Sequence, residues 1–440
     1  MGATMFSRYL GTKIRSGIVA LFHELHPDPI FCTTDKWKDV QEGGFLENDE
    51  FISQMVSRKL IIDTAIVDDQ EFRAAEEKLL KKFSDPTILY LMTAQDCNFS
   101  CAYCPVPSIA KKYGKSVLSN ADAFAGIDLW QEHIQDAYNP NTEYFVIFYG
   151  GEPLLNKPVI KASLEYLEAK RAVGELPANI RYMIATNGSL VDAEIVGLCQ
   201  EYGVSVGVGL DGSASVNDML KRYANGGGTY NMIVAAIKQL VSAGIVVHVS
   251  MSITPFNMDQ IDHHANLLAE LGVSGFGLNF LKGRLLVELV GTEGLQDYYV
   301  RAAQAVIKNA RNSTAPGFEY QFAKKLSAFE TGNFFPVDCT CYGNQLVIQP
   351  DGEISNCPFE KTMLGQVGKV GLDFRIWNQP IVRQWRTRLP LYHPGDAKAL
   401  YGGGCACGTR GIKGDALAVD DSARIFAEEA LDELIWRRYK

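Results

Sequence analysis

The central part of the chain alternates between short apolar runs and amphipathic stretches. Between residues 87 and 280, six strand-like runs are separated by five helical patterns, each followed by glycine or another helix-stop signal. Such alternation predicts an α/β fold with parallel strands, either an open sheet or a barrel. Six units within about 200 residues fit a partial, TIM-like (β/α)6 barrel. The strand-like runs are 87–94, 143–150, 180–187, 204–211, 246–254 and 275–280.

The two ends of the chain follow other patterns. Residues 1–84 combine short extended runs with a helical stretch, which predicts a small α+β unit, and a charged helix leads on to the barrel. In residues 316–440 the alternation stops, and Pro-Asp-Gly at 350–352 separates two alternating runs, which predicts a hairpin. We therefore expect three domains, at 1–84, 85–315 and 316–440.

Composition narrows the class of protein. The chain has 42 Lys and Arg against 51 Asp and Glu, a net charge of −9, which argues against a nucleic acid partner. It has neither an apolar run long enough to span a membrane nor a signal-peptide pattern at residue 1, so we expect no membrane partner and a cytoplasmic location. Thiols stay reduced there, so the ten cysteines are not expected to form disulfides.

Eight of the ten cysteines fall into two groups, a pattern typical of metal ligation. The other two, Cys32 and Cys199, lie in apolar surroundings and are expected in the core. We call residues 97, 101 and 104 the first cysteine group, and the five between 339 and 407 the second. The members are Cys97, Cys101, Cys104, Cys339, Cys341, Cys357, Cys405 and Cys407.

The spacing of the first cysteine group suits an iron–sulfur cluster. Three closely spaced thiolates can bind one face of a [4Fe–4S] cubane and leave one iron without a protein ligand. Such an open position is typical of a metal that does chemistry. A zinc site and three core cysteines are alternatives, but zinc would need a fourth ligand nearby, and no Cys or His occurs between Cys104 and His133.

Polar motifs follow successive predicted strands. Gly-Gly-Glu-Pro (150–153) follows the second, Thr-Asn-Gly (186–188) the third, and Leu-Asp-Gly (210–212) the fourth, while the first cysteine group follows the first. Because the carboxyl ends of parallel strands meet at one edge, we expect these motifs to form a single site.

The segment 97–104, CNFSCAYC, resembles the CxxxCxxC signature of the radical S-adenosylmethionine (SAM) enzymes, including an aromatic residue before the third cysteine. The resemblance extends over residues 86–290, whose motifs are similar to those of the subgroup that includes anaerobic sulfatase-maturating enzymes and peptide (RiPP) maturases. The resemblance implies a [4Fe–4S] cluster whose open iron binds SAM. It also implies that the segment 150–153 accepts hydrogen bonds from the amino group of the methionine part of SAM. The implied SAM contacts are Tyr103, Gly150, Gly151, Glu152, Pro153, Asn187, Asp211 and Arg222.

Some positions depart from this pattern. Gly209 stands where the family often has serine, and the segment 217–222 only loosely matches its His-Asp-x-x-Arg motif. Lys221 or Arg222 could bind the SAM carboxylate, and we expect Arg222 because its guanidinium can make two parallel hydrogen bonds. The stretch 207–212 also matches G-x-G-x-x-G, but a dinucleotide fingerprint should open the first βα unit rather than the fourth.

The second cysteine group resembles a truncated SPASM domain of the twitch-like kind. Full SPASM domains hold two auxiliary clusters, but here one cysteine run is absent and Tyr401 stands at a cysteine position. The resemblance implies one auxiliary [4Fe–4S] cluster held by Cys339, Cys341, Cys357 and Cys405, with Cys407 as a spare or alternate ligand. About eight irons per chain follow, and a four-cysteine zinc site is the alternative. Pro358 replaces the aspartate of sulfatase-type members, which disfavours sulfatase maturation.

The resemblance also implies a substrate. Residues 1–84 are similar in pattern to winged peptide-recognition domains, which bind a leader peptide by strand addition; a capping subdomain is the alternative. Reductive cleavage of SAM would give a 5′-deoxyadenosyl radical that abstracts hydrogen from a ribosomally made precursor peptide and leads to a C–C, C–O or thioether crosslink. The expected electron donor is a flavodoxin or ferredoxin, and no residue is singled out as a general base. A folded-protein or small-molecule substrate is an alternative, and a non-enzymatic iron–sulfur or zinc protein is a third.

Overall fold

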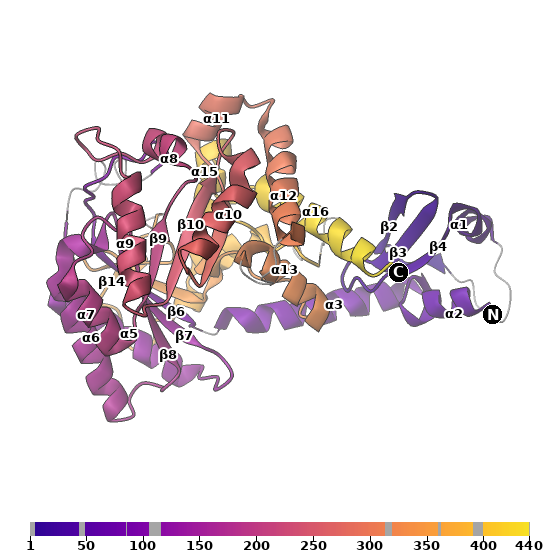
Figure 1. Cartoon of the computed structure of the whole chain (residues 1–440). Coiled ribbons are helices and arrows are strands. Elements are labelled where there is room, and N and C mark those ends of the chain that lie inside the picture. Colours follow the sequence, from indigo (N-terminus) through magenta and orange to yellow (C-terminus); the bar gives the residue numbers. More distant parts are fainter. Residues whose placement is uncertain are drawn as a thin grey trace.

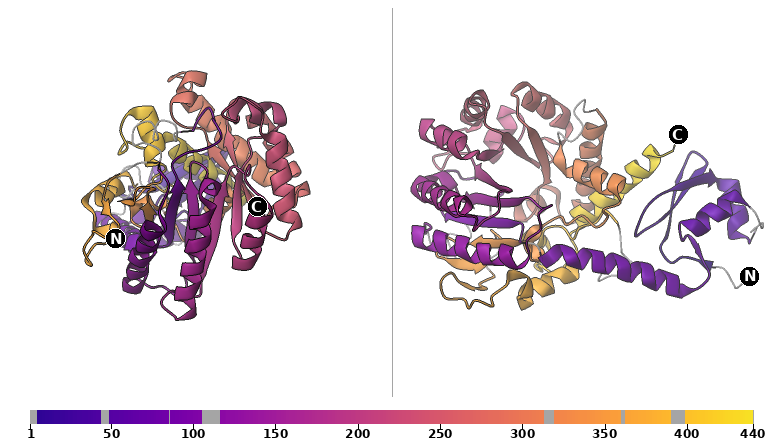
Figure 2. Two further views of the ribbon diagram at one scale, coloured as in Figure 1. Left: turned by 90° about the vertical axis from the view of Figure 1, so that its left-hand side faces the viewer. Right: turned by 90° about the horizontal axis from the view of Figure 1, so that it is seen from below.

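The computed structural model describes residues 5–43, 49–84, 86–104, 116–312, 319–359, 362–389 and 399–439. A large body contains the central sheet, and a smaller N-terminal unit is set apart from it (Figure 1). The long helix α3 (Ala65–Lys81) runs between the two, as the view from below also shows (Figure 2).

The central sheet contains six parallel strands in sequence order, each paired with the next along the chain. This confirms the predicted partial (β/α)6 barrel. Along most of these strands burial alternates, as expected where one face meets the helices and the other lines the barrel interior. The strands are β6 (Ile88–Ala94), β7 (Tyr144–Gly150), β8 (Ile180–Thr186), β9 (Ser205–Gly209), β10 (Val247–Ile253) and β11 (Gly275–Phe280).

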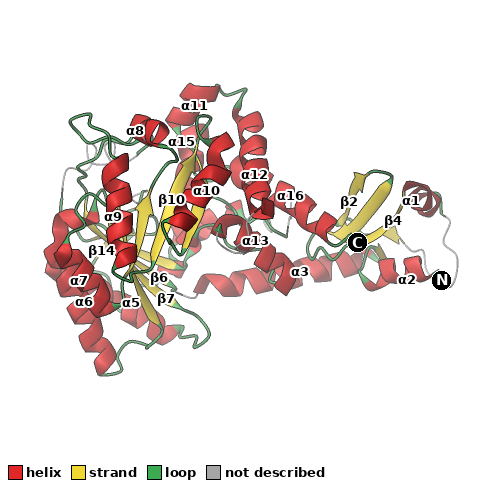
Figure 3. Cartoon of the chain, in the orientation of Figure 1, coloured by secondary structure: helices red, strands yellow, loops and turns green. Residues whose placement is uncertain are grey.

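Helices follow the strands and cover the outside of the barrel (Figure 3). The five predicted crossover helices are present, and a short helix after β9, α8, was not predicted. The barrel helices are α5 (Asn120–Asp136), α6 (Lys157–Ala172), α7 (Ala193–Tyr202), α8 (Ala214–Leu220), α9 (Tyr230–Ser242) and α10 (Ile261–Glu270).

The C-terminal region joins the same sheet. Strand β12 (Gln345–Ile348) pairs in parallel with β6, and the predicted hairpin to β13 (Glu353–Ser355) is confirmed. The turn needs glycine at position 352, where φ is +77°. Strand β14 (Gly365–Gln366) completes the nine-stranded sheet. The second cysteine group is therefore anchored on the barrel sheet itself.

Further helices close the body beyond β11. Helix α16 ends the chain, as the sequence predicts, and packs against α12 and α13. Among the described residues, no helix combines the length and apolarity that crossing a membrane would require. These helices are α11 (Arg284–Val290), α12 (Leu295–Asn312), α13 (Tyr320–Thr331), α14 (Pro380–Trp385), α15 (Ala406–Lys413) and α16 (Asp421–Arg437).

The N-terminal unit is an α+β structure in which a three-stranded antiparallel sheet precedes two short helices. The first helix, α1, was not predicted. The unit contacts the body through α16, where Arg15 pairs with Asp432 at 2.8 Å. Its elements are β1 (Met5–Phe6), β2 (Leu10–Arg15), β3 (Ile18–His23), β4 (Ile30–Thr33), α1 (Thr34–Gln41), α2 (Glu50–Ser57) and β5 (Ile61–Ile62), which pairs with β1.

Candidate functional site

A cavity of about 640 Å³ lies at the carboxyl ends of the barrel strands, where the sequence places the site. All three thiols of the first cysteine group line it, together with residues from the loops after β7 and β8. Of the residues expected to contact SAM, four line the cavity: Tyr103, Gly150, Gly151 and Asn187.

Backbone pairing holds the cysteine loop against the glycine motif. The N–H groups of Gly151 and Glu152 donate to the carbonyls of Ala94 and Asp96, each at 2.9 Å. A Cβ on Gly151 would lie 2.2 Å from the Asp96 carbonyl oxygen, so a larger residue cannot approach this closely. The two glycines therefore bring the loop after β7 onto the loop that carries the thiols.

Glu152 is fully buried and does not line the cavity. Its carboxylate accepts from the Thr186 hydroxyl at 2.6 Å and from the Asn187 N–H at 2.7 Å. Burial raises its pKa, against the effect of these donors. The expected direct contact of Glu152 with SAM is thus not what this geometry favours: the carboxylate holds the Thr-Asn-Gly turn in place. Pro153 is likewise outside the cavity lining.

Asn187 connects that turn to the first cysteine group. Its amide Nδ2 donates to Asn98 Oδ1 at 2.9 Å and lies 3.7 Å from Cys97 Sγ. Ser189 donates to Asn187 Oδ1 and fixes the orientation of the amide. An amide donor is therefore aimed at one of the three thiols.

Tyr103 and Asp211 form a buried pair beside the cavity. The Tyr103 hydroxyl donates to Asp211 Oδ2 at 2.5 Å, and the Ser252 N–H donates to Asp211 Oδ1 at 2.8 Å. Burial, followed by the Asp211 charge, raises the pKa of Tyr103 well above its usual value. Asp211 is outside the cavity lining, so it orients the tyrosine ring that faces the cavity.

Arg222, which the sequence predicts to bind the SAM carboxylate, does not line the cavity. Arg222 is exposed, and its Nε donates to the Asp218 carbonyl. Lys221 instead lines the cavity, with Nζ 3.5 Å from Asp211 Oδ2. The backbone at Lys221 is extended, with φ −118° and ψ 115°, so these neighbouring side chains point in opposite directions. A Cβ at Gly209 would lie 2.4 Å from Lys221 Nζ, so the glycine leaves room for this ammonium.

The first cysteine group offers three thiols to a metal centre. Burial raises the pKa of Cys97 to about 11 and that of Cys101 to about 12, and a bound cation would favour their thiolate forms. Three thiolates can bind three irons of a cubane, one each.

The second cysteine group also comes together. Cys405 Sγ lies 3.2 Å from Cys407 Sγ, and the thiol of Cys407 interacts with that of Cys357. The thiol of Cys339 interacts with that of Cys341, and Cys357 and Cys405 raise the pKa of Cys341 further. Cys407 is therefore a full member of the group, and the choice of four ligands among the five stays a prediction.

The aromatic residue Tyr149 is next to both groups. Its ring lines the cavity, and its pKa is raised by burial and then by the thiols of Cys104, Cys407 and Cys357. The Phe359 ring, which also lines the cavity, lies 5.6 Å from it. Neither residue was predicted to belong to the site. Their positions in the sequence could have indicated it, because Tyr149 directly precedes the glycine motif and Phe359 follows Cys357 by two positions.

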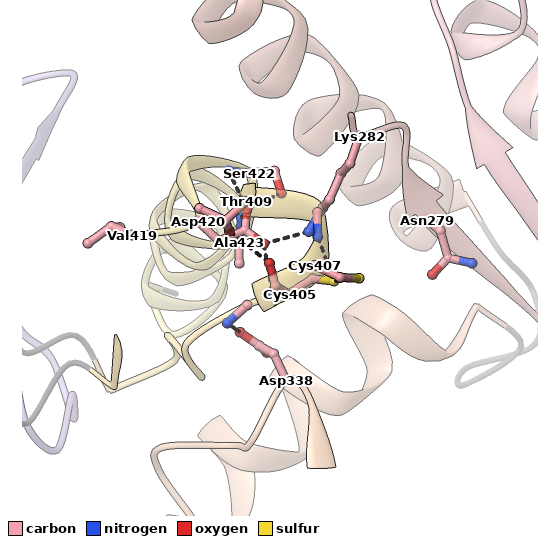
Figure 4. A network of polar contacts seen from close by, with 12 residues as sticks. Asn279, Lys282, Asp338, Cys405, Cys407, Thr409, Val419, Asp420, Ser422 and Ala423 are labelled. Atoms are coloured by element: carbon pink, nitrogen blue, oxygen red, sulfur yellow. Dashed lines mark hydrogen bonds and ion pairs between the residues drawn. The ribbon is translucent and has the colours of Figure 1, made fainter. Parts of the chain in front are cut away.

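A polar network holds the turn that carries Cys405 (Figure 4). Asp420 accepts from the Cys405 N–H at 2.7 Å and from Lys282 Nζ at 2.5 Å. Burial opposes its charge, but Lys282 and these donors lower the pKa of Asp420 to about 2. Asp338 accepts from the N–H groups of Gly402 and Gly404. The sequence did not reveal this network, because Lys282 follows β11 and lies far from Asp420 along the chain.

Comparison with known proteins agrees with this site. The model of the Radical SAM superfamily matches residues 91–268, which include the first cysteine group and the motifs after β7, β8 and β9. The solved structure of native anSMEcpe with bound AdoMet and a peptide superposes with a TM-score of 0.62 at 16% identity, covering 80% of this chain and 99% of that one. This likeness shows a shared fold.

Two named relatives are similar in sequence. The antilisterial bacteriocin subtilosin biosynthesis protein AlbA of Bacillus subtilis is 23% identical over 72% of this chain and 66% of its own. The radical SAM cyclopropyl synthase TigE of Paramaledivibacter caminithermalis is 23% identical over 51% of each. The chain spans about half to two thirds of the length of the curated relatives it matches.

The three thiols that line the cavity and the motifs after β7, β8 and β9 lie within the matched residues, whereas Tyr320 and Phe359 of the cavity wall lie outside them. Residues 91–268 therefore form a radical SAM domain, which uses a [4Fe–4S] cluster and S-adenosylmethionine, and the chain is similar in sequence to AlbA and TigE.

Proposed function

We propose that this enzyme modifies a ribosomally made precursor peptide and forms an oxidative crosslink in it. The observation that carries the proposal is Tyr149, which borders the cavity and both cysteine groups. The similarity to AlbA, a bacteriocin biosynthesis protein, supports a peptide as substrate.

The first cysteine group would hold the cluster that binds SAM. When bound, the cluster and SAM supply a carbon radical that removes a hydrogen atom from the substrate. The glycines at 150 and 151 expose backbone next to the thiols, where carbonyls can accept from the SAM amine. Lys221 is the cavity-lining cation and would pair with the SAM carboxylate.

Aromatic side chains restrict water around the reacting substrate. Phe99, Tyr149, Tyr320 and Phe359 line the cavity, and its exposed surface is mainly apolar. A carbon radical formed there is shielded from side reactions with solvent. The Tyr103 ring, held by Asp211, would lie against the nucleoside end of SAM.

Formation of a crosslink removes two hydrogen atoms from the peptide. The first leaves as an atom, so the second must leave as a proton and an electron, and a neighbouring centre has to accept that electron. The second cysteine group would hold the auxiliary cluster that does so, because Cys357 and Cys407 lie within electrostatic reach of Tyr149. We expect a flavodoxin or ferredoxin to supply the electron that starts the reaction.

The N-terminal unit would bind the leader of the precursor. Its antiparallel sheet has the strand order β2-β3-β4, so β2 and β4 are edges to which an extended peptide can add. The contacts of Arg15 and Phe31 with α16 join this sheet to the body that holds the cavity.

The test is coexpression with a precursor peptide encoded beside the gene, followed by mass spectrometry. The proposal expects 5′-deoxyadenosine and a peptide that has lost two hydrogens. A peptide whose mass is unchanged in ordinary water, but which gains one deuterium when the reaction is run in heavy water, would indicate an epimerase instead. Deoxyadenosine with no change in any leader-containing peptide, but turnover of a folded protein or small molecule, would overturn the choice of substrate.

A further inference from the structure

Arg388 is a fully buried arginine with an incomplete set of partners. It lies at the end of a short 3-10 helix, Arg386–Arg388, and none of its surface is exposed. Its Nη2 donates to Thr409 Oγ1 at 3.0 Å, and its Nε to the Ala418 carbonyl at 3.3 Å. Among the described residues, its Nη1 has no hydrogen-bond partner. A guanidinium carries five N–H donors and keeps its charge, so this site holds a positive charge.

No carboxylate among the described residues forms an ion pair with Arg388. The carboxylate that acts on it most strongly is that of Asp420, but Asp420 already pairs with Lys282 at 2.5 Å. The nearby carboxylate of Asp338 likewise pairs with Lys325, so the charge of Arg388 has no ion-pair partner among the described carboxylates. A buried charge without compensation is strongly unfavourable, so the site needs a further negative group.

The second cysteine group is placed to supply that negative charge. The guanidinium acts electrostatically on Cys339 and Cys341. Its partner Thr409 also donates to the Cys405 carbonyl at 2.7 Å, so one hydroxyl links the guanidinium to the cysteine turn. Leu389, the next residue, packs in the same cluster of buried side chains as Cys341 and Cys357.

A cluster held by four thiolates carries net negative charge, and this charge grows by one when the cluster accepts an electron. Reduction potentials of such clusters depend on net charge, hydrogen bonds and burial. A fixed cation at short range in a dry interior therefore stabilises the reduced form more than the oxidised form. A cluster that accepts an electron from the substrate benefits from this stabilisation of its reduced form.

We propose that Arg388 is the built-in counter-charge of the auxiliary cluster, and that it raises the reduction potential of the cluster so that it can accept an electron from the substrate. The inference rests on the proposed function for the presence of that cluster. Arg388 is a positioning residue in this scheme, because it touches neither SAM nor the peptide.

The test uses the full chain with Cys97→Ala, Cys101→Ala and Cys104→Ala, so that only the auxiliary cluster remains. After anaerobic reconstitution, iron is counted and the midpoint potential is measured by redox titration with EPR detection. We expect about four irons in this parent. Arg388→Gln is expected to keep them and to shift the midpoint to a more negative potential. Arg388→Lys, which keeps the charge, should lie near the parent.

Arg383→Gln is the matched control, because Arg383 is an exposed arginine on the preceding helix α14. Its midpoint should equal that of the parent. Equal midpoints for Arg388→Gln and the parent would overturn the inference. If Arg388→Gln binds no iron, recovery of iron by Arg388→Lys supports the inference, and failure of Arg388→Lys overturns it, since a packing role then suffices.

Neither SAM nor peptide is present in this experiment, so its result does not depend on the identity of the substrate. If the parent variant binds no iron, the chain has no auxiliary cluster, which overturns both this inference and the electron acceptor in the proposed function. If the midpoint potentials follow the expected order but no peptide is modified in the coexpression test, the role of Arg388 stands and only the proposed peptide substrate is overturned.

Discussion

The two cysteine groups show how the surroundings of a thiol decide its role. The first group has three thiols on the wall of a cavity of about 640 Å³, beside glycines that leave space for a ligand. The second has two buried and three partly buried thiols, none of which lines the cavity, with Arg388 and Lys282 near them. We therefore call the first an open site, which a ligand can enter, and the second a closed site, for which we propose electron transfer.

The cations near the two groups differ in the same way. Lys221 lines the cavity and can meet an anionic ligand from solution. Arg388 is fully buried, and Lys282, which is half-buried, pairs with Asp420, so their positive charge acts on groups that belong to the protein. A substitution at the first kind of cation should change ligand affinity, whereas one at the second kind should change an internal property such as a reduction potential.

The largest expected effect comes from removing the open site. Replacement of Cys97, Cys101 and Cys104 by alanine should abolish 5′-deoxyadenosine formation and lower iron from about eight to about four per chain. Cys199→Ala is the control, because Cys199 is buried in the apolar core and should leave both values unchanged. Deoxyadenosine from the triple variant would show that the two groups are assigned wrongly.

Removal of a thiol from the closed site should separate the two steps. Cys357→Ala is expected to lose about four irons and all crosslinked peptide, while SAM cleavage continues, because its thiol belongs to the second group. Chromatography of deoxyadenosine and mass spectrometry of the peptide measure the two outcomes. Loss of both products together, in a folded protein, would mean that the sites do not act separately.

The lysine of the open site should control SAM affinity. Lys221→Met removes a charged hydrogen bond worth about 1.5–3 kcal/mol, so SAM binding should weaken by roughly 10- to 100-fold. Arg222→Met is the matched control and should stay within about twofold, because its side chain is exposed and hydrogen-bonds only within its own turn. SAM affinity is measured by titration. A larger loss of affinity in Arg222→Met than in Lys221→Met would mean that Arg222 binds the SAM carboxylate.

The smallest effect is expected at Glu152. Glu152→Gln replaces one carboxylate oxygen by an NH2 group that faces N–H and O–H donors. The free energy of unfolding should fall by about 1–3 kcal/mol, as measured by denaturant titration. Glu165→Gln on the exposed face of α6 should change it by less than about 0.5 kcal/mol. A variant as stable as the parent that fails to bind SAM would mean that Glu152 contacts SAM directly.

Patterns of neighbouring residues in the sequence correctly predict the parts of this structure that depend on local interactions. The alternation of burial along the strands, the turn at 350–352 and the placement of motifs after strands follow from period and turn chemistry, and all three are seen. Helix α8 was missed because the segment around it is polar and rich in glycine, so its helical period is weak.

Other parts depend on the assembled fold. Lys221 and Arg222 are neighbours of similar chemistry, and only the extended backbone at the end of α8 decides which one enters the cavity. Lys282, Arg388 and Asp420 come from three distant segments, so no spacing rule could connect them. Their association shows only once the turn at 402–405 is folded.

The central claim is that one open and one closed iron–sulfur site flank the same cavity. EPR spectroscopy of the reduced, reconstituted protein, with and without SAM, tests it most directly. The account predicts two [4Fe–4S] signals of equal intensity, of which SAM changes only the one that disappears in the variant lacking Cys97, Cys101 and Cys104. A single signal, or a change in both signals on addition of SAM, would contradict it.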